Sequence, residues 1–256
     1  MLKATMFQRL VALILALGLM LITLPASAQS PPDAVPFSWG LNSYGQLGNG
    51  TTTNSAIPVE VSNLSGVIAI AGGQFHTLAL GSDGTVWAWG ENTYGELGNG
   101  STTNSTIPIQ VRNLSSIIAV AAGGFHSLAL KNDGTVWAWG YNFYGELGNG
   151  TTTNSAIPVQ VSNLSGVIAI MAGYYHSLGL RSDGTVWAWG ENGYGELGNG
   201  TTANSSFPVQ VSSLSEVITI SAGGAHNLAL QPPTVAPIPY RLYLPIALNS
   251  CTTCAP

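Results

Sequence analysis

The chain has 256 residues, of which 7% are charged and 45% hydrophobic, and it contains 32 glycines. Low charge combined with this apolar content argues against intrinsic disorder, and the absence of a Gly-X-Y period excludes collagen. Six residues are basic and 11 are acidic. Because affinity for nucleic acid depends mainly on Lys and Arg, we expect no nucleic-acid partner.

Residues 1–28 have the three parts of an export signal. Lys3 and Arg9 give a positive start, residues 10–24 are almost wholly apolar, and Ala26-Ser27-Ala28 offers a cleavage site. The apolar run is shorter than the roughly 20 residues of a spanning helix. We therefore predict cleavage after Ala28, no membrane span in the mature chain, and secretion, or a periplasmic location where there is an outer membrane. An uncleaved anchor is the alternative. A short linker is expected at 29–35.

A repeat of 50 residues dominates the rest of the sequence. Trp39-Gly40 recurs three times at this spacing, and so do the histidines, His76, His126, His176 and His226. Residues 89–138 and 139–188 are identical at 35 of 50 positions. Repeats of this length indicate one structural unit copied in tandem.

One unit, taken from residue 139, predicts a compact glycine-rich loop and four short strands. The strands are expected at 158–161, 167–172, 175–180 and 185–189, with a tight Asp-Gly turn before the last. The apolar run 167–172 predicts a strand buried on both faces. Four antiparallel strands per repeat are typical of a β-propeller blade, so the predicted fold is all-β.

The motifs of this unit resemble the regulator of chromosome condensation repeat. They are Trp-Gly-x-Asn-x-Tyr-Gly-Glu-Leu-Gly-Asn-Gly, Ala-Gly-Gly-x-His-Ser-Leu-Ala-Leu and Asp-Gly-Thr-Val-Trp-Ala-Trp-Gly, and the likeness covers residues 37–230. The resemblance implies a β-propeller domain over 36–230. Members usually have seven blades.

This chain has only four blade equivalents, which we place at 58–89, 108–139, 158–189 and 208–230. Residues 37–40 have the sequence of the strand that the last blade lacks. Pairing of that strand with the last blade would close a four-bladed ring. An open crescent, or a homodimer of two chains paired through open blade edges into an eight-bladed ring, satisfies the same pattern.

No residue pattern predicts catalysis, a cofactor or a metal. The histidines could form a ring of metal ligands, but identical placement in every repeat favours a structural role as hydrogen-bonding residues within each blade. The aspartates of the Asp-Gly turns, Asp83, Asp133 and Asp183, suit turn geometry. Nothing among Glu96, Glu146 and Glu196 singles out a catalytic pair.

Differences between repeats are more informative about function. Tyr141 and Phe143 follow one Trp-Gly, and Tyr174 and Tyr175 precede the histidine of the next blade. If strands alternate in direction, the two loops share one face. Aromatic clusters on loops favour partner binding, whereas the structural alternative is packing against neighbouring loops. We expect these four residues to form a partner-binding patch.

The C-terminal segment differs from the repeats. Residues 231–239 predict a stiff Pro-rich linker, and 240–256 form an apolar, strand-like tail. Cys251 and Cys254 sit near its end, and in an exported chain they favour a local disulfide or intermolecular pairing.

The expected function is a secreted, non-enzymatic, protein-binding module with an unidentified partner, acting as an inhibitor-like or adhesive scaffold. The resemblance supplies a secreted bacterial precedent, an inhibitor of β-lactamase, although none of its binding residues maps onto this chain. The main alternative is a carbohydrate-active or lyase-type propeller enzyme. Guanine-nucleotide exchange, as in nuclear members of the family, is less favoured because the chain carries an export signal and few basic residues.

Overall fold

The computed structural model describes residues 34–233, and every regular element in this range is a β-strand. The predicted signal peptide, most of both linkers, the tail and its two cysteines lie outside the described residues. Within residues 34–233 no helix could cross a membrane. The strands are β1 (Phe37–Gly40), β2 (Ser55–Glu60), β3 (Val67–Gly72), β4 (His76–Gly81), β5 (Val86–Gly90), β6 (Ser105–Gln110), β7 (Ile117–Ala122), β8 (His126–Lys131), β9 (Val136–Gly140), β10 (Ser155–Gln160), β11 (Val167–Ala172), β12 (His176–Arg181), β13 (Val186–Gly190), β14 (Ser205–Gln210), β15 (Thr219–Ala222) and β16 (Asn227–Leu230).

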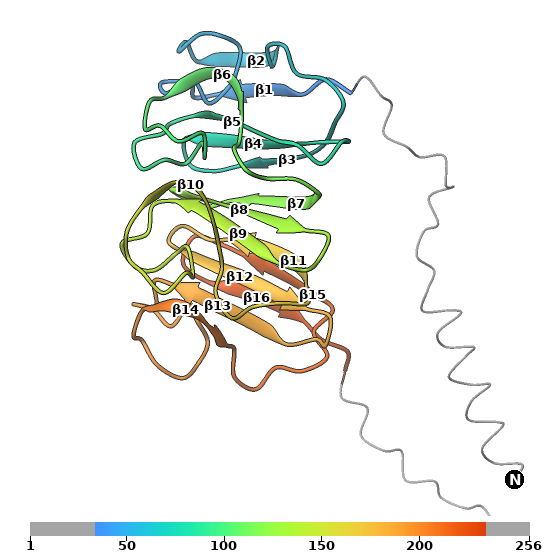
Figure 1. Cartoon of the computed structure of the whole chain (residues 1–256), viewed down its shortest axis with the longest axis vertical. Helices are drawn as coiled ribbons and strands as arrows, with labels where there is room; N and C mark the ends of the chain where they lie inside the picture. Colours follow the sequence, from blue (N-terminus) through green and yellow to red (C-terminus); the bar gives the residue numbers. More distant parts are fainter. Residues whose placement is uncertain (1–33, 234–256) are drawn as a thin grey trace, which may run out of the picture.

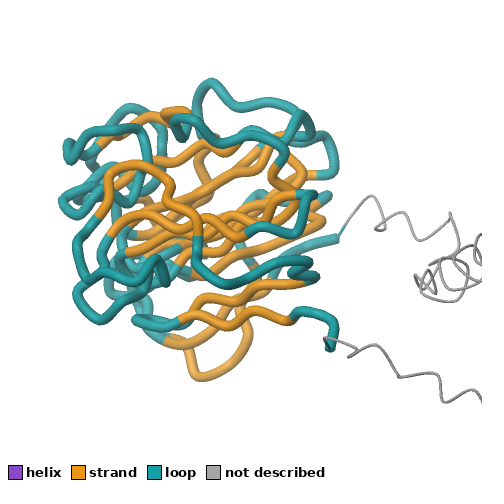
Figure 2. Tube along the Cα trace, turned by 90° about the horizontal axis from the view of Figure 1, so that it is seen from below, coloured by secondary structure: helices purple, strands orange, loops and turns teal. Residues whose placement is uncertain are grey.

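Three complete blades and two half-sheets make up the fold. The complete blades are the antiparallel sheets β3–β6, β7–β10 and β11–β14, and the half-sheets are β1–β2 and β15–β16. The blades stack face to face, with the two half-sheets at opposite ends of the stack (Figure 1). The end-on view shows the strands packed side by side and the loops gathered around them (Figure 2).

The blade boundaries differ from those expected from the sequence. Each Pro-containing strand pairs with the preceding Trp strand, as β6 does with β5, so it is the fourth strand of its own blade and not the first of the next. The blades are therefore 67–110, 117–160 and 167–210. A strict period defines the length of a unit but not where the unit starts, and the long glycine loop turned out to lie inside the blade.

The strand 37–40 does not close the ring. It pairs with β2, in the register that β5 makes with β6, and β16 pairs only with β15 among the described residues. Of the arrangements predicted from the sequence, the described chain adopts the open array. The half-sheets β15–β16 and β1–β2 correspond to the first two and the last two strands of one blade.

The first strand of each blade is less buried than its apolar sequence predicts. A bulge between Val67 and Ala69 turns Ile68 to solvent, and the same bulge recurs in β7 and β11. The isoleucines at this position are all exposed, namely Ile68, Ile118, Ile168 and Ile218. The prediction of a strand buried on both faces was wrong, because an extra residue in a bulge breaks the alternation of side chains.

The core lies between the blades. Leu128, Leu130 and Val136 of one blade pack with Val167, Ile170 and Trp189 of the next. The equivalent cluster between the first two complete blades contains Trp139, which is fully buried. Gly98 makes room for this indole, since a Cβ there would lie 2.9 Å from Trp139 Nε1. The second tryptophan of each Trp-Ala-Trp sequence, namely Trp89, Trp139 or Trp189, thus fills the gap between blades.

Candidate partner-binding site

The loop that carries Tyr141 and Phe143 is held by a buried asparagine. Asn142 is fully buried, and its Nδ2 donates to the carbonyl oxygens of Thr151 and Thr153, both at 3.0 Å. Its Oδ1 accepts from the backbone N–H of Leu147 at 2.9 Å. One side chain therefore holds the backbone between residues 142 and 153 in a compact loop, so the flanking aromatics stand on a fixed support.

Tyr174 and Tyr175 occupy the turn between β11 and β12. The N–H of Tyr174 donates to the carbonyl of Gly224 at 2.9 Å, and its carbonyl accepts from the N–H of Gly124 at 3.1 Å. Its hydroxyl donates to Gln74 Oε1 at 2.6 Å, 100 residues away in the sequence. Tyr174 therefore connects the third complete blade to the first.

The structure brings the four predicted aromatic residues together. The ring centroids of Tyr141 and Phe143 lie 6.4 Å apart, those of Tyr141 and Tyr175 5.6 Å, and those of Tyr174 and Tyr175 4.5 Å. The two loops share one face, as expected from alternating strand directions. The three pairs are stacked at 29°, tilted at 45° and edge-on at 85°, at distances typical of interacting aromatic rings.

The four residues belong to a larger group of rings. Phe125 contacts Tyr141, Tyr174 and Tyr175, and continues through Phe75 to Tyr44. We call the whole set the aromatic cluster: Tyr44, Phe75, Tyr94, Phe125, Tyr141, Phe143, Tyr144, Tyr174 and Tyr175. Phe143 is its most open member, with 64% of the residue exposed, so the cluster ends in an apolar ring that faces solvent.

Comparison of the repeats separates two kinds of residue in this cluster. Tyr175 is matched by Phe75 and Phe125, which pack on Tyr44 and Tyr94 as Tyr175 packs on Tyr144. These rings are part of the repeat itself. Tyr141, Phe143 and Tyr174 have no aromatic equivalents in the other repeats, where the same positions hold Leu41, Glu91 and Glu191, Ser43, Thr93 and Gly193, and Gln74, Gly124 and Gly224.

The sequence interpretation missed the supporting rings because it searched only for residues that differ between repeats. The recurrence of Tyr at 44, 94, 144 and 194 was the available signal.

The cluster also affects the ionisation of Tyr141. Burial, followed by the nearby Glu146 carboxylate, raises the pKa of Tyr141 to about 12. The hydroxyl stays protonated at neutral pH and can donate a hydrogen bond to a partner.

The histidines connect neighbouring blades. His76 Nε2 lies 2.9 Å from Ser127 Oγ, His126 Nε2 lies 2.8 Å from Ser177 Oγ, and both rings are buried. Each ring also covers the glycine three residues before it, Gly73 or Gly123. Their hydrogen bonds therefore run between blades and not within a blade as expected. Burial lowers the pKa of His76 to about 4 and that of His126 to about 3, so both are neutral at physiological pH.

The repeated glutamates are enclosed in the loops. Glu96 and Glu146 are fully buried, and each accepts one bond from a backbone N–H, that of Tyr94 at 2.9 Å or of Tyr144 at 3.0 Å. Their other carboxylate oxygens have no partner. Burial raises the pKa of Glu96 to about 7 and that of Glu146 to about 8. Gln46 fills the same place in the first loop and accepts from the N–H of Tyr44 at 2.9 Å, so the loop needs an acceptor there but not a charge.

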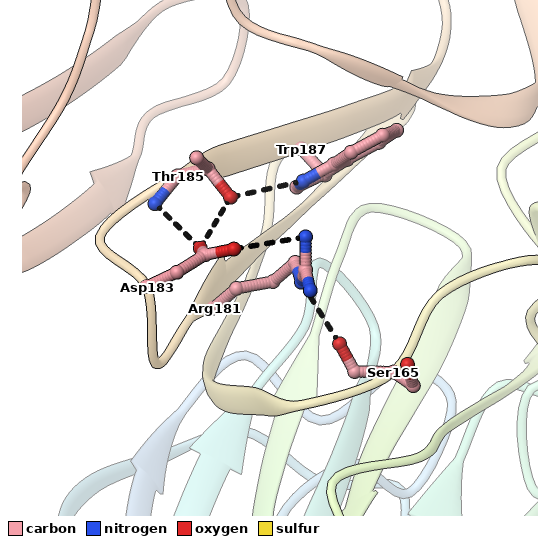
Figure 3. A network of polar contacts seen from close by, with 5 residues as sticks. All are labelled: Ser165, Arg181, Asp183, Thr185 and Trp187. Carbon is pink, nitrogen blue, oxygen red and sulfur yellow. Dashed lines mark hydrogen bonds and ion pairs between the residues drawn. The ribbon is translucent and has the colours of Figure 1, made fainter.

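The aspartates of the Asp-Gly turns also serve the fold. Asp183 Oδ1 accepts from the N–H and hydroxyl of Thr185 at 3.0 and 2.6 Å, and Oδ2 pairs with Arg181 at 3.0 Å (Figure 3). Arg181 Nε in turn donates to the carbonyl of Ser165 at 3.0 Å. These bonds to Thr185 lower the pKa of Asp183. In residues 34–233 no three His, Cys, Asp or Glu side chains are grouped to hold a metal ion.

These features define an open, propeller-type array of tandem blades with one aromatic face. A model of the regulator of chromosome condensation (RCC1) repeat matches residues 37–80, 83–130, 133–180 and 183–230, and a second RCC1 repeat model matches residues 67–96, 117–146 and 167–196. The chain belongs to the RCC1-repeat family.

Solved structures agree with this assignment. The chain is similar to human WBSCR16, with a TM-score of 0.71 and 26% identity over 78% of this chain and 54% of that one. It shares its fold with Prp20p of Saccharomyces cerevisiae, with a TM-score of 0.66 and 24% identity over 75% of this chain and 50% of that one. The chain thus spans about half the length of these propellers. A 65-residue segment, which is 24% of this chain, is 35% identical to a segment of the human E3 ubiquitin-protein ligase HERC2 that makes up 1% of that protein.

Proposed function

We propose that this RCC1-repeat array is a secreted, non-enzymatic module that binds another protein through the aromatic cluster. The observation that carries the proposal is the convergence of Tyr141, Phe143 and Tyr174, the three aromatics that break the repeat, on one face. Tandem copies preserve residues that the fold requires, whereas recognition of a partner needs residues that differ between copies.

The chemistry of this face suits a protein partner. Phe143 offers an exposed apolar ring, and Tyr141 offers a ring with a protonated hydroxyl. Aromatic residues held on rigid supports are frequent hot spots of protein interfaces, and each costs at least about 2 kcal/mol when removed. Prp20p, which shares the fold, is described with binding to Gsp1p and histones. For this chain that precedent supports protein binding in general, not a particular partner.

Several features disfavour the other functions. Glu96 and Glu146 are buried and have raised pKa values, but they are enclosed in their loops and recur in the repeats, unlike a single catalytic group that must reach a substrate. A nucleic-acid partner or an activity that depends on a basic surface is disfavoured because the described residues include only Arg112, Lys131 and Arg181 as basic side chains. The export signal predicted at 1–28 supports the secreted location.

The sharpest test exchanges the three residues for those of sister repeats. The variant Tyr141→Glu, Phe143→Thr, Tyr174→Gln uses the residues found at Glu91, Thr93 and Gln74, so each has a place in the same fold. Photo-cross-linking from position 143 in the medium of the producing cells identifies a candidate partner, and titration calorimetry with the purified partner measures affinity. We expect the exchange to weaken binding at least about a thousandfold.

The matched control is Ile57→Ser, which removes an apolar residue that is 69% exposed on β2, outside the cluster. Circular dichroism should show that both variants are folded. The melting temperature should be unchanged in Ile57→Ser and lowered by a few degrees in the exchanged variant, which loses ring contacts of the cluster. Equal affinity of the wild type and the exchanged variant would refute the proposal. Unfolding of the exchanged variant would show instead that these aromatics are needed for packing.

A further inference from the structure

The two ends of the array carry complementary halves of one blade. In the complete blades the second and third strands pair with fixed partners: His76 with Gly90, Leu78 with Ala88 and Ala79 with Trp87. The equivalent strands of the half-sheets are β16 and β1. The same register would set Leu228 opposite Ser38 and Ala229 opposite Phe37. Both strands leave one edge unpaired among the described residues, and open edges favour pairing with another strand.

At the β1 end of the array, Trp39 is not buried against a neighbouring blade. Trp89, Trp139 and Trp189 are buried between blades, whereas Trp39 at the same place in the repeat is 65% exposed. The buried indoles donate from Nε1 to the carbonyls of Gln46, Glu96 and Glu146, at 2.9, 2.6 and 2.7 Å. By the same spacing, the acceptor for Trp39 would be the carbonyl of Glu196, at the opposite end of the array.

At the opposite end, the position that a tryptophan fills between complete blades is an open cavity. A cavity of about 380 Å³ there is lined by Leu178, Val186, Gly198, Val211, Leu214 and Ile220. Fifty residues earlier, the equivalents of these residues surround Trp189: Leu128, Val136, Val161, Leu164 and Ile170 belong to its cluster, and a Cβ at Gly148 would lie 2.9 Å from its indole. At Gly198 a Cβ would meet only Val211 within 4 Å.

The series of histidine hydrogen bonds between blades is also incomplete at this end. His76, His126 and His176 each bond to a residue 51 positions later, at 2.9, 2.8 and 2.7 Å. His226, the last of the series, is exposed, and by the same spacing its partner would be Thr77. The Thr77 hydroxyl donates to the carbonyl of Gln46 at 2.9 Å and has its acceptor side left for an imidazole. The open edges of β1 and β16, the exposed indole of Trp39 and the exposed His226 therefore all indicate one missing contact, between a β1 end and a β16 end of the array, which we call the joint.

We propose that a second copy of the chain fills this joint, with β1 and Trp39 of each copy completing the last blade of the other in a closed ring of eight blades. Curvature selects a second copy over the chain's own N-terminal strand. The array superposes on about half of the WBSCR16 propeller, and its ends lie apart (Figure 1). Two such halves close a ring of a size known for propellers. Two-fold symmetry about the ring axis also places both aromatic clusters on one face.

Solution mass gives the first test. Multi-angle light scattering of the purified full chain should report two chains for the wild type and one for Trp39→Ala, with the dimer dissociation constant raised at least about a hundredfold. Ile57→Ala, on the outer strand of the same half-sheet, should leave the mass unchanged. A wild-type mass of one chain overturns the proposal. A mass well above two chains also overturns it, since the edges would then build an open filament.

Cross-linking gives the register and identifies the occupant. In a Cys251→Ser, Cys254→Ser background, Phe37→Cys and Ala229→Cys are made in separate preparations, mixed, and oxidised. We expect a disulfide between chains, because directly opposed residues of antiparallel strands lie within disulfide reach. Ser221→Cys, on the inner strand β15, replaces Ala229→Cys in the control and should give none. No cross-link in the mixture, combined with an intrachain bond when both cysteines share one chain, would establish a four-bladed ring; no bond in either would indicate that another segment covers the edge.

Discussion

Trp139 and Trp39 occupy the same place in the repeat and have opposite surroundings. Trp139 is fully buried between two complete blades and donates to the carbonyl of Glu96 at 2.6 Å. Within residues 34–233, the half-sheet that carries Trp39 has no blade on its outer side, and most of the surface of Trp39 is exposed. Equivalent positions of the repeat therefore differ in burial, because the core of this fold forms between repeats and not within them.

The same contrast extends along the two ends of the array. His126 and Leu128 are buried, whereas His226 and Leu228 are exposed, the latter at 64%. A terminal repeat usually carries a polar outer face that acts as a cap. These terminal strands keep the apolar residues of an internal blade instead, which is consistent with a joint and not with a cap.

The largest difference between the two regions should appear when the equivalent tryptophans are removed. We expect Trp139→Ala to lower the free energy of unfolding by about 3–5 kcal/mol, since it leaves a cavity and removes one of the two hydrogen bonds that the carbonyl of Glu96 accepts. Trp39→Ala should change it by less than about 1 kcal/mol in dilute solution, where chains are separate. Urea denaturation of the two variants measures both values. Equal losses would contradict the open array, because Trp39 would then be buried within its own chain.

A second contrast is between a loop that contains a buried glutamate and the first loop, which contains Gln46. Burial raises the pKa of Glu146 to about 8, above its ordinary value of 4.5. A carboxyl whose pKa is raised on folding loses stability as the pH rises from its unfolded pKa to its folded one. Glu146→Gln should therefore stabilise the protein by about 2–4 kcal/mol at pH 8.5 and change it little at pH 4.5.

The buried histidines lower the stability at acidic pH, and their contribution must be separated from that of Glu146 at alkaline pH. Their lowered pKa values remove stability as the pH falls from about 6.5 toward 4. Chemical denaturation between pH 6.5 and 8.5 isolates the glutamate contribution. Gln46→Glu is the reciprocal variant and should introduce the same alkaline loss into the first loop, though a smaller one because Gln46 is only half-buried. A Glu146→Gln variant whose stability kept the alkaline slope of the wild type would show that Glu146 is ionised in the fold.

The repeat, the four-stranded antiparallel sheet and the shared face of the aromatic loops could all be predicted from the sequence. They depend on local patterns: alternation in the Trp strands, Asp-Gly turns, and a strict spacing that places equivalent loops on the same side. The prediction that residues 37–40 have the sequence of a missing strand also agrees with the pairing of β1, which matches that of β5.

The start of a blade and the closure of the ring could not be predicted. A periodic sequence has no intrinsic first strand, so only the pairing of β6 with β5 shows that the Pro strand ends a blade. Closure depends on the angle between neighbouring blades, and this angle is set by small differences in packing at every contact between blades. The bulge at Ile68 and the role of Asn142 were missed for a different reason, because a buried polar residue and an extra strand residue leave no clear mark in an apolar pattern.

The smallest expected difference concerns a tyrosine of the aromatic cluster and its equivalent in the last repeat. Tyr144 is half-buried and packs against Tyr141, Phe143 and Tyr175 at centroid distances of 6.3, 5.1 and 5.4 Å. Tyr194 is 85% exposed, and the residues that would face it are Glu191, Gly193 and Ala225. Because aromatic pairs contribute about 0.5–1.5 kcal/mol beyond their buried area, Tyr144→Ala should cost about 1–2 kcal/mol, whereas Tyr194→Ala should stay within about 0.5 kcal/mol.

This pair separates the effect of the cluster from the effect of the open end. The positions that would face Tyr194 are not aromatic in the sequence, so completing the last blade would not give it ring partners. Tyr194 also lines the cavity proposed for Trp39 of the second copy, so thermal unfolding of Tyr144→Ala and Tyr194→Ala is compared at low protein concentration, where chains are separate. A cost for Tyr194→Ala that grows with concentration would support the contact between chains, and equal costs at low concentration would mean that the rings around Tyr144 add nothing to stability.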